Sequence, residues 1–445
     1  MKNFKESLNP SKILVIGFAI LILLGTFLLS LPIAVEDGER LSFLDALFTA
    51  TSATCVTGLV VVDTGDTFSL FGELVILTLI QLGGLGFMTF ATFLFALLGK
   101  KISLKERLLL KEALNTASPA GMVKLVKRIL LFTVITELIG ATILAIRFSY
   151  DMPIGQAFYF GIFHTISLFN NAGFDVMGEF RSLTDYVDDP IVVLTACSLI
   201  IIGGLGFVVV NELYEFRQTR RMSFHTKVVL STTLILIAGS TILIFLFEYG
   251  NDKTLGPLSS TGKALGALFH GVTPRTAGAN TLSTPDLTHA TLFLTIFLMF
   301  IGGGSGSTAG GIKVSTFAVL MATALSQLKG KENVVLFKRR IVVENILKAF
   351  TVAMSGIMII VIVTFLLSIT EHGHAFMIYL FEATSAFGTA GLSMGLTPEL
   401  SPIGRILIIL TMFVGRLGPL TLGFAITKRQ RKEAFRHPKG NIMIG

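Results

Sequence analysis

The sequence predicts an all-α, polytopic membrane protein built from four similar segments. Its 445 residues are 52% hydrophobic and only 14% charged, whereas a soluble domain carries about 25% charged residues. The mean hydropathy is +0.77, and several uncharged stretches exceed the roughly 18 residues that can cross a bilayer. A glycine motif recurs four times at regular spacing, and clusters of basic residues recur between its copies.

The repeated motif is clearest in its first and last copies. ATSATCVTGLVVV at 50–62 and ATSAFGTAGLSMG at 383–395 share the ATSA quartet when Gly58 is aligned with Gly391. Weaker copies carry Gly173 and Gly278. The glycines are 115, 105 and 113 residues apart, which predicts a fourfold repeat of about 110 residues. The predicted domains are repeats 1–98, 99–212, 213–328 and 329–430, followed by a cytoplasmic tail at 431–445.

Each repeat contains a long apolar helix, a short apolar segment, the glycine loop and a second long helix. The short segments are too short to span a bilayer but suit a re-entrant helix. Such a loop is tolerated only where protein buries it or where it lines a water-filled cavity. We therefore expect eight transmembrane helices and four re-entrant pore loops, in membrane–pore–membrane order. The predicted segments are 13–35, 41–53 and 68–98; 126–148, 154–169 and 191–211; 228–247, 262–271 and 288 onward; and 341–369, 375–386 and 403–426.

The basic residues predict the orientation of the chain. Lys and Arg gather in segments that alternate with the glycine loops, and acidic residues predominate on the opposite side. By the positive-inside rule the basic segments and both termini are cytoplasmic. Because these segments recur at the same phase, the repeats are expected to be parallel, around a central pseudo-fourfold pore. An inverted-repeat carrier of another small solute is the alternative. The basic segments are 1–12, 99–128, 215–228, 328–348 and 428–445.

The glycine loops are the candidate ion site. Glycine allows the backbone to turn its carbonyls toward an axis, and rings of carbonyl dipoles can replace the water shell of a cation. No carboxylate occupies the central positions, so a monovalent cation fits better than a divalent one. Close helix packing is the plainer explanation of a single glycine, but four in register favour a filter. Its predicted carbonyl ligands belong to Val56, Thr57, Gly58, Asn171, Ala172, Gly173, Thr276, Ala277, Gly278, Thr389, Ala390 and Gly391.

The third repeat contains a predicted helix break, IGGGSGSTAGGIK at 301–313. Each glycine costs about 1 kcal/mol relative to alanine in a helix, so the helix should end near Gly302 and resume near Val314. The segment resembles a dinucleotide fingerprint and a Walker A loop. It lacks a surrounding βαβ unit, and Ile312 stands where a Walker lysine is required. Broken backbone at membrane depth implies a cavity, here the pore just below the filter.

Arg416 stands in VGRLG, 414–418, which aligns with QLGGLGF at 81–87 and IGGLGF at 202–207. It should therefore lie near the middle of the membrane, beside the pore. A mid-helix arginine costs about 2.5–3.5 kcal/mol on insertion scales, so it is a functional candidate by default. Its expected partners are serine hydroxyls and carbonyls of the broken loop.

Together, these motifs resemble the Trk/Ktr/HKT superfamily of potassium transporters over nearly the whole chain. The resemblance implies potassium uptake across the plasma membrane, with sodium left open as a coupling ion. Glycine at 58 implies potassium, because a serine there accompanies sodium transport in the superfamily. The resemblance also implies a homodimer standing on a cytosolic ring of nucleotide-binding (KtrA-like) regulatory subunits. It assigns gating to Gly302, Gly303, Gly304, Ser305, Gly306, Ser307, Thr308, Ala309, Gly310, Gly311, Lys313 and Arg416.

Other features argue against an enzyme. No HExxH or GxSxG motif occurs, and the two cysteines, Cys55 and Cys197, suggest neither a metal site nor a disulfide framework. We expect no cofactor beyond the transported ion. The first apolar run is too long for a signal peptide and is expected to be retained. Four polar residues at membrane depth, His164, His270, Glu382 and Glu137, are expected to be structural, with a second ion site the alternative for Glu137.

Overall fold

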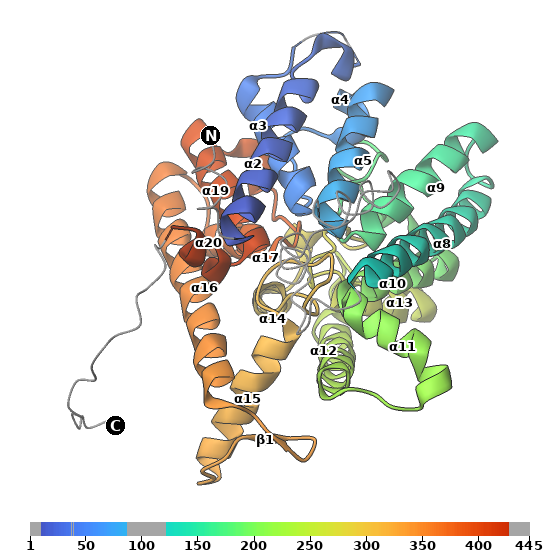
Figure 1. Cartoon of the computed structure of the whole chain (residues 1–445). Helices are drawn as coiled ribbons and strands as arrows, with labels where there is room; N and C mark the ends of the chain where they lie inside the picture. Colours follow the sequence, from blue (N-terminus) through green and yellow to red (C-terminus); the bar gives the residue numbers. More distant parts are fainter. Residues whose placement is uncertain (1–9, 37, 39, 87–121, 427–445) are drawn as a thin grey trace.

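The computed structural model describes residues 10–36, 38, 40–86 and 122–426, and Figure 1 shows the whole chain. These residues are almost entirely helical. The two strands among them, β1 (Val335–Leu336) and β2 (Arg339–Arg340), form a small antiparallel hairpin. The second half of the predicted helix 68–98, most of the basic segment 99–128 and the tail 427–445 lie outside the described residues.

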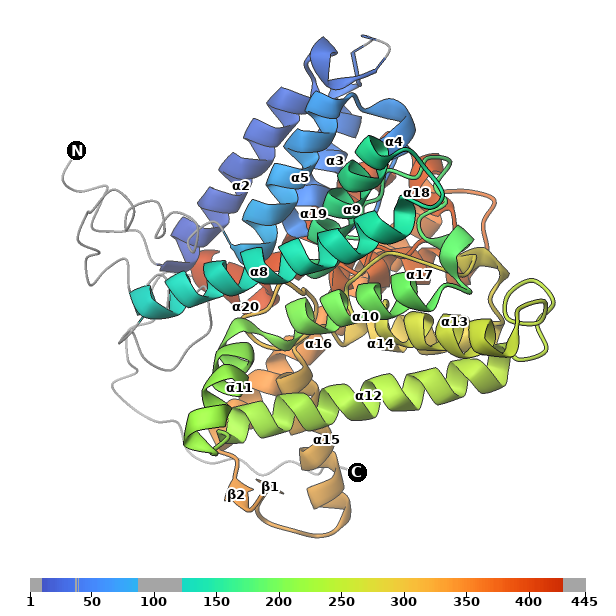
Figure 2. The ribbon, with the colours of Figure 1, turned by 90° about the vertical axis from the view of Figure 1, so that its right-hand side faces the viewer.

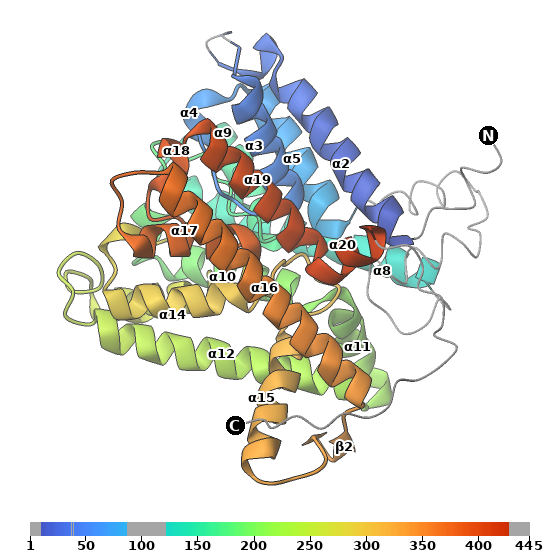
Figure 3. The ribbon, with the colours of Figure 1, turned by 90° about the vertical axis from the view of Figure 1, so that its left-hand side faces the viewer.

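Four helices of the described chain are long and apolar enough to cross a membrane. Large apolar side chains such as Leu23, Leu138 and Phe365 are exposed along them, as expected for a surface that faces lipid. Each of the four helices lies at the outside of the bundle in Figures 2 and 3. These helices are α2 (Pro10–Leu29), α8 (Met122–Phe148), α12 (Phe224–Glu248) and α16 (Val343–Thr370).

Each long helix is followed by a short one whose carboxyl-terminal half is buried. Ser42 and Ser259 cap two of them by accepting the Asp45 and Gly262 backbone N–H groups, the usual role of serine at a helix start. The predicted re-entrant segments agree with these helices to within a few residues. They are α3 (Phe43–Cys55), α9 (Ile154–Phe169), α13 (Ser260–Val272) and α17 (Phe376–Gly388).

The second helices of repeats two and four differ from the prediction. The expected continuous helices at 191–211 and 403–426 are wrong, because each ends before a glycine of positive φ: Gly206 at +97° and Gly418 at +82°. A right-handed helix cannot contain this conformation. Gly86, at +79°, ends the first repeat's helix in the same way. The resulting helices are α5 (Leu70–Leu85), α10 (Pro190–Leu205), α11 (Phe207–Thr219), α19 (Pro402–Leu417) and α20 (Pro419–Ile426).

Chain direction changes sharply between α10 and α11, which meet at 100°. In the third repeat the predicted break is confirmed: α14 (His289–Phe300) ends before the glycine run, and α15 (Val314–Leu328) begins where the sequence indicates. Short elements occupy the remaining loops. These are η1 (Pro32–Ala34), α4 (Thr64–Thr67), η2 (Thr184–Tyr186), η3 (Thr284–Asp286) and α18 (Leu396–Glu399).

The first and last parts of the chain pack together, which closes the bundle. Helix α19 lies beside α3 (Figure 3), and Arg405 of α19 forms an ion pair with Asp45 of α3. Cys55 and Leu59 share one hydrophobic cluster with Phe387 and Met412. The glycine loops at the ends of α3 and α17 are therefore held close to each other.

Candidate functional site: a ring of four glycine loops

The four aligned glycines form a closed ring. A Cβ added to Gly58 would lie 3.1 Å from the Cα of Gly173, and one on Gly173 would lie 2.7 Å from that of Gly278. One on Gly278 would lie 3.1 Å from the Cα of Gly391, and one on Gly391 would lie 3.3 Å from that of Gly58. No room exists for a side chain at any of the four positions. The ring follows chain order and closes from the last loop to the first.

Backbone carbonyl oxygens are interleaved with these glycines. A Cβ added at each glycine would lie closest to a carbonyl oxygen of the neighbouring loop. That oxygen belongs to the residue that precedes the neighbouring loop's own glycine. Those residues are Ala172, Ala277, Ala390 and Thr57, all predicted ligands. The structure thus brings the four predicted loops together and places their carbonyls in a ring. Rings of this kind can replace the hydration shell of a cation.

The four loops share an unusual backbone conformation. Each filter glycine has positive φ, between +70° and +88°, and so does the residue two positions earlier. Those earlier residues are Val56, Asn171, Thr276 and Thr389, at φ between +49° and +79°. Positive φ is uncommon for residues with a side chain and is unfavourable for β-branched ones. Such strain clusters at binding sites, where the surrounding structure maintains it.

Hydrogen bonds hold each loop against its own short helix. The Thr57, Ala172 and Ala390 amides each donate to a serine carbonyl one turn back, of Ser52, Ser167 and Ser385 respectively, at 2.8 Å. In the third loop Pro274 follows α13 closely, and the Ala277 amide donates to the Thr273 carbonyl at 2.9 Å. Because proline cannot continue a helix, α13 ends earlier than its counterparts.

A cavity of about 440 Å³ lies against one side of the ring and is lined by all four glycines. Its wall includes Asp63, Asp175 and Glu179, with Arg181 opposing them. Such a surplus of carboxylates concentrates cations. Asp63 also organises the wall by accepting a hydrogen bond from the Phe180 amide, and Asp66, which does not line the cavity, accepts one from the Glu179 amide.

Asp175 lies in the loop two residues after a filter glycine. Burial, together with the nearby carboxylates of Asp63 and Asp66, raises the pKa of Asp175 to about 7. The Met177 amide donates to its Oδ1 at 3.2 Å and opposes that shift. This carboxyl therefore changes charge near neutral pH, at the mouth of the ring.

On the opposite side of the ring, the segment 301–313 forms a compact loop. The Gly302 amide donates to the Ile312 carbonyl at 2.8 Å, and the Lys313 ammonium donates to the Ala309 carbonyl at 2.6 Å. Ser307 donates to the Gly304 carbonyl at 2.7 Å. Gly310 packs directly against the Thr389 side chain. The loop is therefore folded tightly against the fourth filter loop.

The same loop docks onto the glycine break of the second repeat. The Gly304 amide donates to the Gly204 carbonyl at 2.7 Å, and the Phe207 amide donates to the Gly306 carbonyl at 2.9 Å. A Cβ on Gly206 would lie 2.6 Å from the Ser305 carbonyl oxygen. The sequence did not indicate this docking site. The one residue that distinguishes this site in the sequence is Gly206, the third glycine of the IGGLGF motif.

Arg416 ties the loop to the first repeat. Its guanidinium donates to the carbonyls of Thr308 and Gly83, and to that of Gly84 at 3.3 Å. The expected carbonyl partner in the broken loop is present, whereas the hydroxyls of Ser305 and Ser307 bond elsewhere. A planar guanidinium suits several carbonyls at once. Gly83 and Gly84 are partners that the sequence argument missed.

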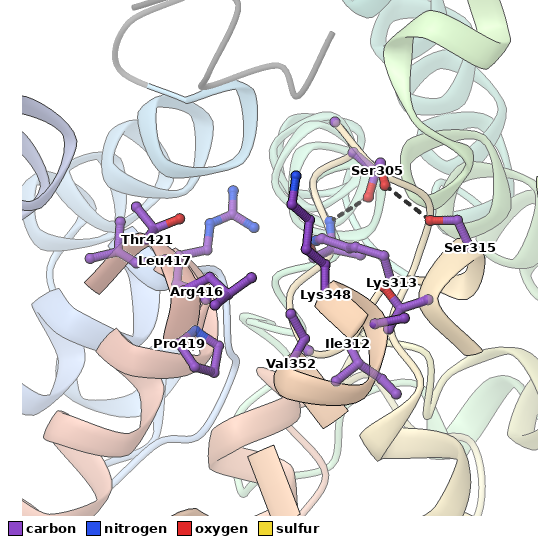
Figure 4. Close-up of a pocket in the computed structure, with 18 of the residues that line it drawn as sticks. Ser305, Ile312, Lys313, Ser315, Lys348, Val352, Arg416, Leu417, Pro419 and Thr421 are labelled. Carbon is purple, nitrogen blue, oxygen red and sulfur yellow. Dashed lines mark hydrogen bonds between the residues drawn. The ribbon is translucent and has the colours of Figure 1, made fainter. Parts of the chain in front are cut away.

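A second cavity of about 850 Å³ lies on this side of the loop. Figure 4 shows Arg416 and Lys348 extending into it, and Ser305 hydrogen-bonded to Ser315 at 3.2 Å. Among the described residues that line it, the charged side chains, Lys313, Lys348 and Arg416, are all basic. The two cavities on either side of the filter loops thus differ in the sign of their charge.

Each of the four other polar residues singled out in the sequence has at least one protein partner. His164 contacts the Phe160 carbonyl at 2.7 Å, His270 contacts Thr295 at 3.0 Å, and Glu382 accepts from Ser393 at 2.9 Å. Glu137 is bonded to side-chain amides. Arg275, a buried residue that the sequence argument overlooked, stands three positions before Gly278 and lies 3.5 Å from the Thr233 hydroxyl.

Comparisons with known proteins agree with this architecture. A family model described as a cation transport protein, TrkH, matches residues 3–435. The chain is 46% identical to the Ktr system potassium uptake protein B of Bacillus subtilis, over 98% of this chain and 97% of that protein. It is 41% identical to the potassium/sodium uptake protein NtpJ of Enterococcus hirae, over 100% of this chain and 99% of that protein.

The fold also matches a solved structure. The potassium transporter TrkH from Vibrio parahaemolyticus superposes with a TM-score of 0.71, over 92% of this chain and 84% of that chain, at 20% identity. None of the relatives named here is an enzyme. The family model spans nearly the whole sequence, and full-length relatives exceed 40% identity. The chain is therefore a multi-pass membrane protein that belongs to the TrkH family of cation transport proteins.

Proposed function

We propose that this protein takes up potassium across the plasma membrane through the ring at Gly58, Gly173, Gly278 and Gly391. The closed ring of glycines and interleaved carbonyls is the observation that carries the proposal. Dehydrated potassium needs neutral oxygen dipoles at close range, and backbone carbonyls supply them without fixed negative charge. The names of the relatives, which include potassium uptake proteins, support the same ion.

The proposed architecture is four parallel membrane–pore–membrane repeats around this ring, with eight spans and both termini cytoplasmic. The recurrence of long helix, short helix, glycine loop and interrupted helix supports it. The acidic cavity faces the outside, where it concentrates cations before they enter the filter. The basic cavity faces the cytoplasm, in accord with the positive-inside distribution of charge.

The segment 302–313 and Arg416 form the proposed gate. The loop lies against Thr389 of the filter and lines the inner cavity, so an ion leaving the ring meets it at once. Arg416 holds the loop closed through Thr308 and places a positive charge in the path. Opening requires that the loop leave the break at Gly206 and that Arg416 release its carbonyls.

We further propose that the protein works as a homodimer on a cytosolic ring of nucleotide-binding (KtrA-like) regulatory subunits. The similarity to subunits named for a Ktr system supports this arrangement. Sodium is proposed as a coupling ion, supported by a relative named as a potassium/sodium uptake protein. No further cofactor is proposed.

The test is potassium uptake in a bacterium that lacks its own uptake systems, with wild type compared with Gly58→Ser, Gly278→Ser and Gly391→Ser. Each serine side chain would meet a neighbouring loop within about 3 Å. We expect the apparent affinity for potassium to fall, or sodium to enter, at unchanged membrane abundance.

Gly155→Ser is the matched control. Gly155 lies in α9, and a Cβ there would meet nothing within 4 Å, so this variant should transport like wild type. If the three ring variants also transport like wild type, the glycines only pack helices and the proposed filter is wrong.

A further inference from the structure

A polar cluster lies behind the second filter loop, inside the helix bundle. Gln81 of α5 donates to the Glu137 carboxylate of α8, at 3.0 Å to Oε1 and 3.3 Å to Oε2. Asn170, which follows α9, donates to the Gln81 side-chain oxygen at 2.7 Å and to Glu137 at 3.3 Å. We call Gln81, Glu137 and Asn170 the amide–carboxylate triad. Its members come from α5, α8 and the residue that follows α9, and so from two repeats.

The triad reaches the filter directly through the main chain. Asn170 is fully buried, and its side chain also donates to the Ile166 carbonyl at 2.9 Å. The next residue, Asn171, is one of the four that hold positive φ before a filter glycine. The hydrogen bonds of Asn170 to α9 and to the other triad members therefore restrict the backbone at Asn171. The conformation at Asn171 in turn sets the direction of the Ala172 carbonyl.

Packing leaves Asn170 little freedom to move. A Cβ added to Gly84 would collide with the Asn170 side-chain oxygen, so α5 packs directly against this side chain. The same stretch of α5 carries the Gly83 and Gly84 carbonyls that accept from Arg416. One segment of α5 thus contacts the triad on one side and the gate arginine on the other.

The corresponding positions of the other repeats are not equivalent. The first, third and fourth repeats have Cys55, Arg275 and Gly388, respectively, where the second repeat has Asn170, three residues before the filter glycine. Aligned on the glycine pair of the second helix, Ile201 and Phe413 replace Gln81. A carboxylate in the membrane interior is costly and is expected to serve a function. In this cluster the carboxylate of Glu137 lies at the junction of the first and second repeats.

We propose that the triad positions the second filter loop and thereby sets the cation selectivity of the ring. Glu137 is a positioning residue: it touches no ion and acts through Gln81 and Asn170. The inference rests on the proposed function of the ring. It deepens that function by making discrimination between potassium and sodium depend on a carboxylate that lies outside the pathway.

The experiment measures rubidium and potassium uptake, with sodium as competitor, for Gln81→Leu, Glu137→Leu and the double variant. We expect the apparent KM for potassium to rise about tenfold and discrimination against sodium to fall. The maximal rate per membrane-inserted protein should change by no more than about threefold. Because the residues act as a unit, the double variant should be no worse than either single one. Glu137→Gln, which keeps an acceptor oxygen, should recover part of the selectivity.

Thr142→Ala is the control. Thr142 lies in the same helix as Glu137, and its hydroxyl bonds only to the Leu138 carbonyl of that helix, at 2.8 Å. It should leave both KM and selectivity unchanged. Should Glu137→Leu fail to reach the membrane, Gln81→Leu still breaks the bridge without removing the carboxylate.

Two results would overturn the inference. One is a KM and selectivity within twofold of wild type in the triad variants. The other is a loss of maximal rate with both quantities unchanged, because that pattern indicates support of the fold alone. Gly173→Ser, measured in the same series, separates this inference from the proposed function. Uptake that responds to Gly173→Ser but not to the triad variants contradicts the triad alone, whereas a wild type without potassium uptake contradicts both.

Discussion

Val56, Thr276 and Thr389 carry β-branched side chains at positive φ, each two residues before a filter glycine. Strain of this kind costs on the order of 1–3 kcal/mol per residue. Contacts with neighbouring loops offset this strain. Gly310 of the third repeat packs on Thr389, and the residues around Thr57 pack on Gly391. The conformation of each filter residue therefore depends on contacts made by other repeats.

At Arg416, the charge and the fork geometry can be separated by substitution. Arg416→Gln removes the positive charge and should raise the maximal rate of potassium uptake at least tenfold, since a cation in the path repels a passing ion. Arg416→Lys keeps the charge but cannot bridge the Thr308, Gly83 and Gly84 carbonyls, so its rate should stay within a few-fold of wild type. Rubidium flux into vesicles containing the purified protein measures both.

A surface arginine, Arg217 of α11, supplies the control substitution Arg217→Gln. Equal rates for wild type, Arg416→Gln and the control would show that Arg416 is no barrier. A Lys variant as fast as the Gln variant would mean that the bonds, rather than the charge, keep the path closed.

Asp175 predicts a dependence on external pH. Its pKa is raised to about 7, so the carboxyl is charged above that pH and neutral below it. Lowering external pH from 8 to 6 should therefore raise the apparent KM for potassium several-fold, as one negative charge leaves the outer cavity. Asp175→Asn should have the high KM at both pH values. The measurement is initial uptake rate against potassium concentration at each pH.

Asp185→Asn is the matched control for this effect. Asp185 is an exposed carboxylate of the same loop that does not line the cavity, and the variant should keep the wild-type pH response. A KM that is flat from pH 8 to 6 in wild type, or one that still shifts in Asp175→Asn, would exclude Asp175 as the titrating group.

The four glycines that meet in the ring could be found from the sequence because one alignment register explained all four. The recurring motif and its regular spacing indicated Gly58, Gly173, Gly278 and Gly391, and the lack of space around them supplies the physical reason. Asp175 and the Gly83 carbonyl could not be found in that way. Their roles depend on which loops meet in space, and the sequence contains no periodic signal for such meetings.

The helix breaks at Gly86, Gly206 and Gly418 are the main lesson at the scale of elements. Apolar composition made 191–211 and 403–426 look like single helices, and a lone glycine costs a helix only about 1 kcal/mol. Tertiary contacts decide the outcome, because the Phe207 amide bonds to the Gly306 carbonyl rather than within α10. The break at 302–311 was predictable because six glycines make any helix unfavourable.

These breaks allow the docking of the segment 301–313 to be tested. Gly206→Ala introduces both backbone strain and a contact at 2.6 Å with the Ser305 carbonyl, whereas Gly418→Ala introduces strain with nothing within 4 Å. Gly206→Ala should therefore weaken the docking of the loop and raise rubidium leak through the purified protein alone. Gly418→Ala should lower thermal stability without a comparable leak. Equal leak in the two variants would show that the loop does not depend on the α10–α11 break.

For the whole molecule, ion binding should stabilise the fold. The ring joins all four repeats, so a bound potassium ion bridges parts of the chain that are hundreds of residues apart. A ligand at a hundredfold excess over its Kd contributes about 2.7 kcal/mol. We expect the midpoint of thermal unfolding to rise with potassium or rubidium and to change little with sodium at equal ionic strength. Gly391→Ser should lose this response.

The protein supplies its own probe for that measurement. Cys55 and Cys197 are free and buried, and the chain has no tryptophan. A dye that fluoresces on reacting with thiols would therefore report unfolding. Identical midpoints in potassium and sodium would indicate that the ring does not bind either ion selectively.

The closure of the ring between Gly391 and Gly58 has a consequence for biogenesis. The contact joins the first loop to emerge from the ribosome to the last, so loop closure spans most of the chain. Until α17 and its loop have been inserted, the first and third loops each lack a neighbour on one side, and their strained turns lack the support of that neighbour. Nascent chains that end before the fourth repeat should be recognised by membrane proteases as incomplete. A missense substitution that slows insertion of α17 would then lower the amount of protein through degradation, even where the substituted side chain touches no ion.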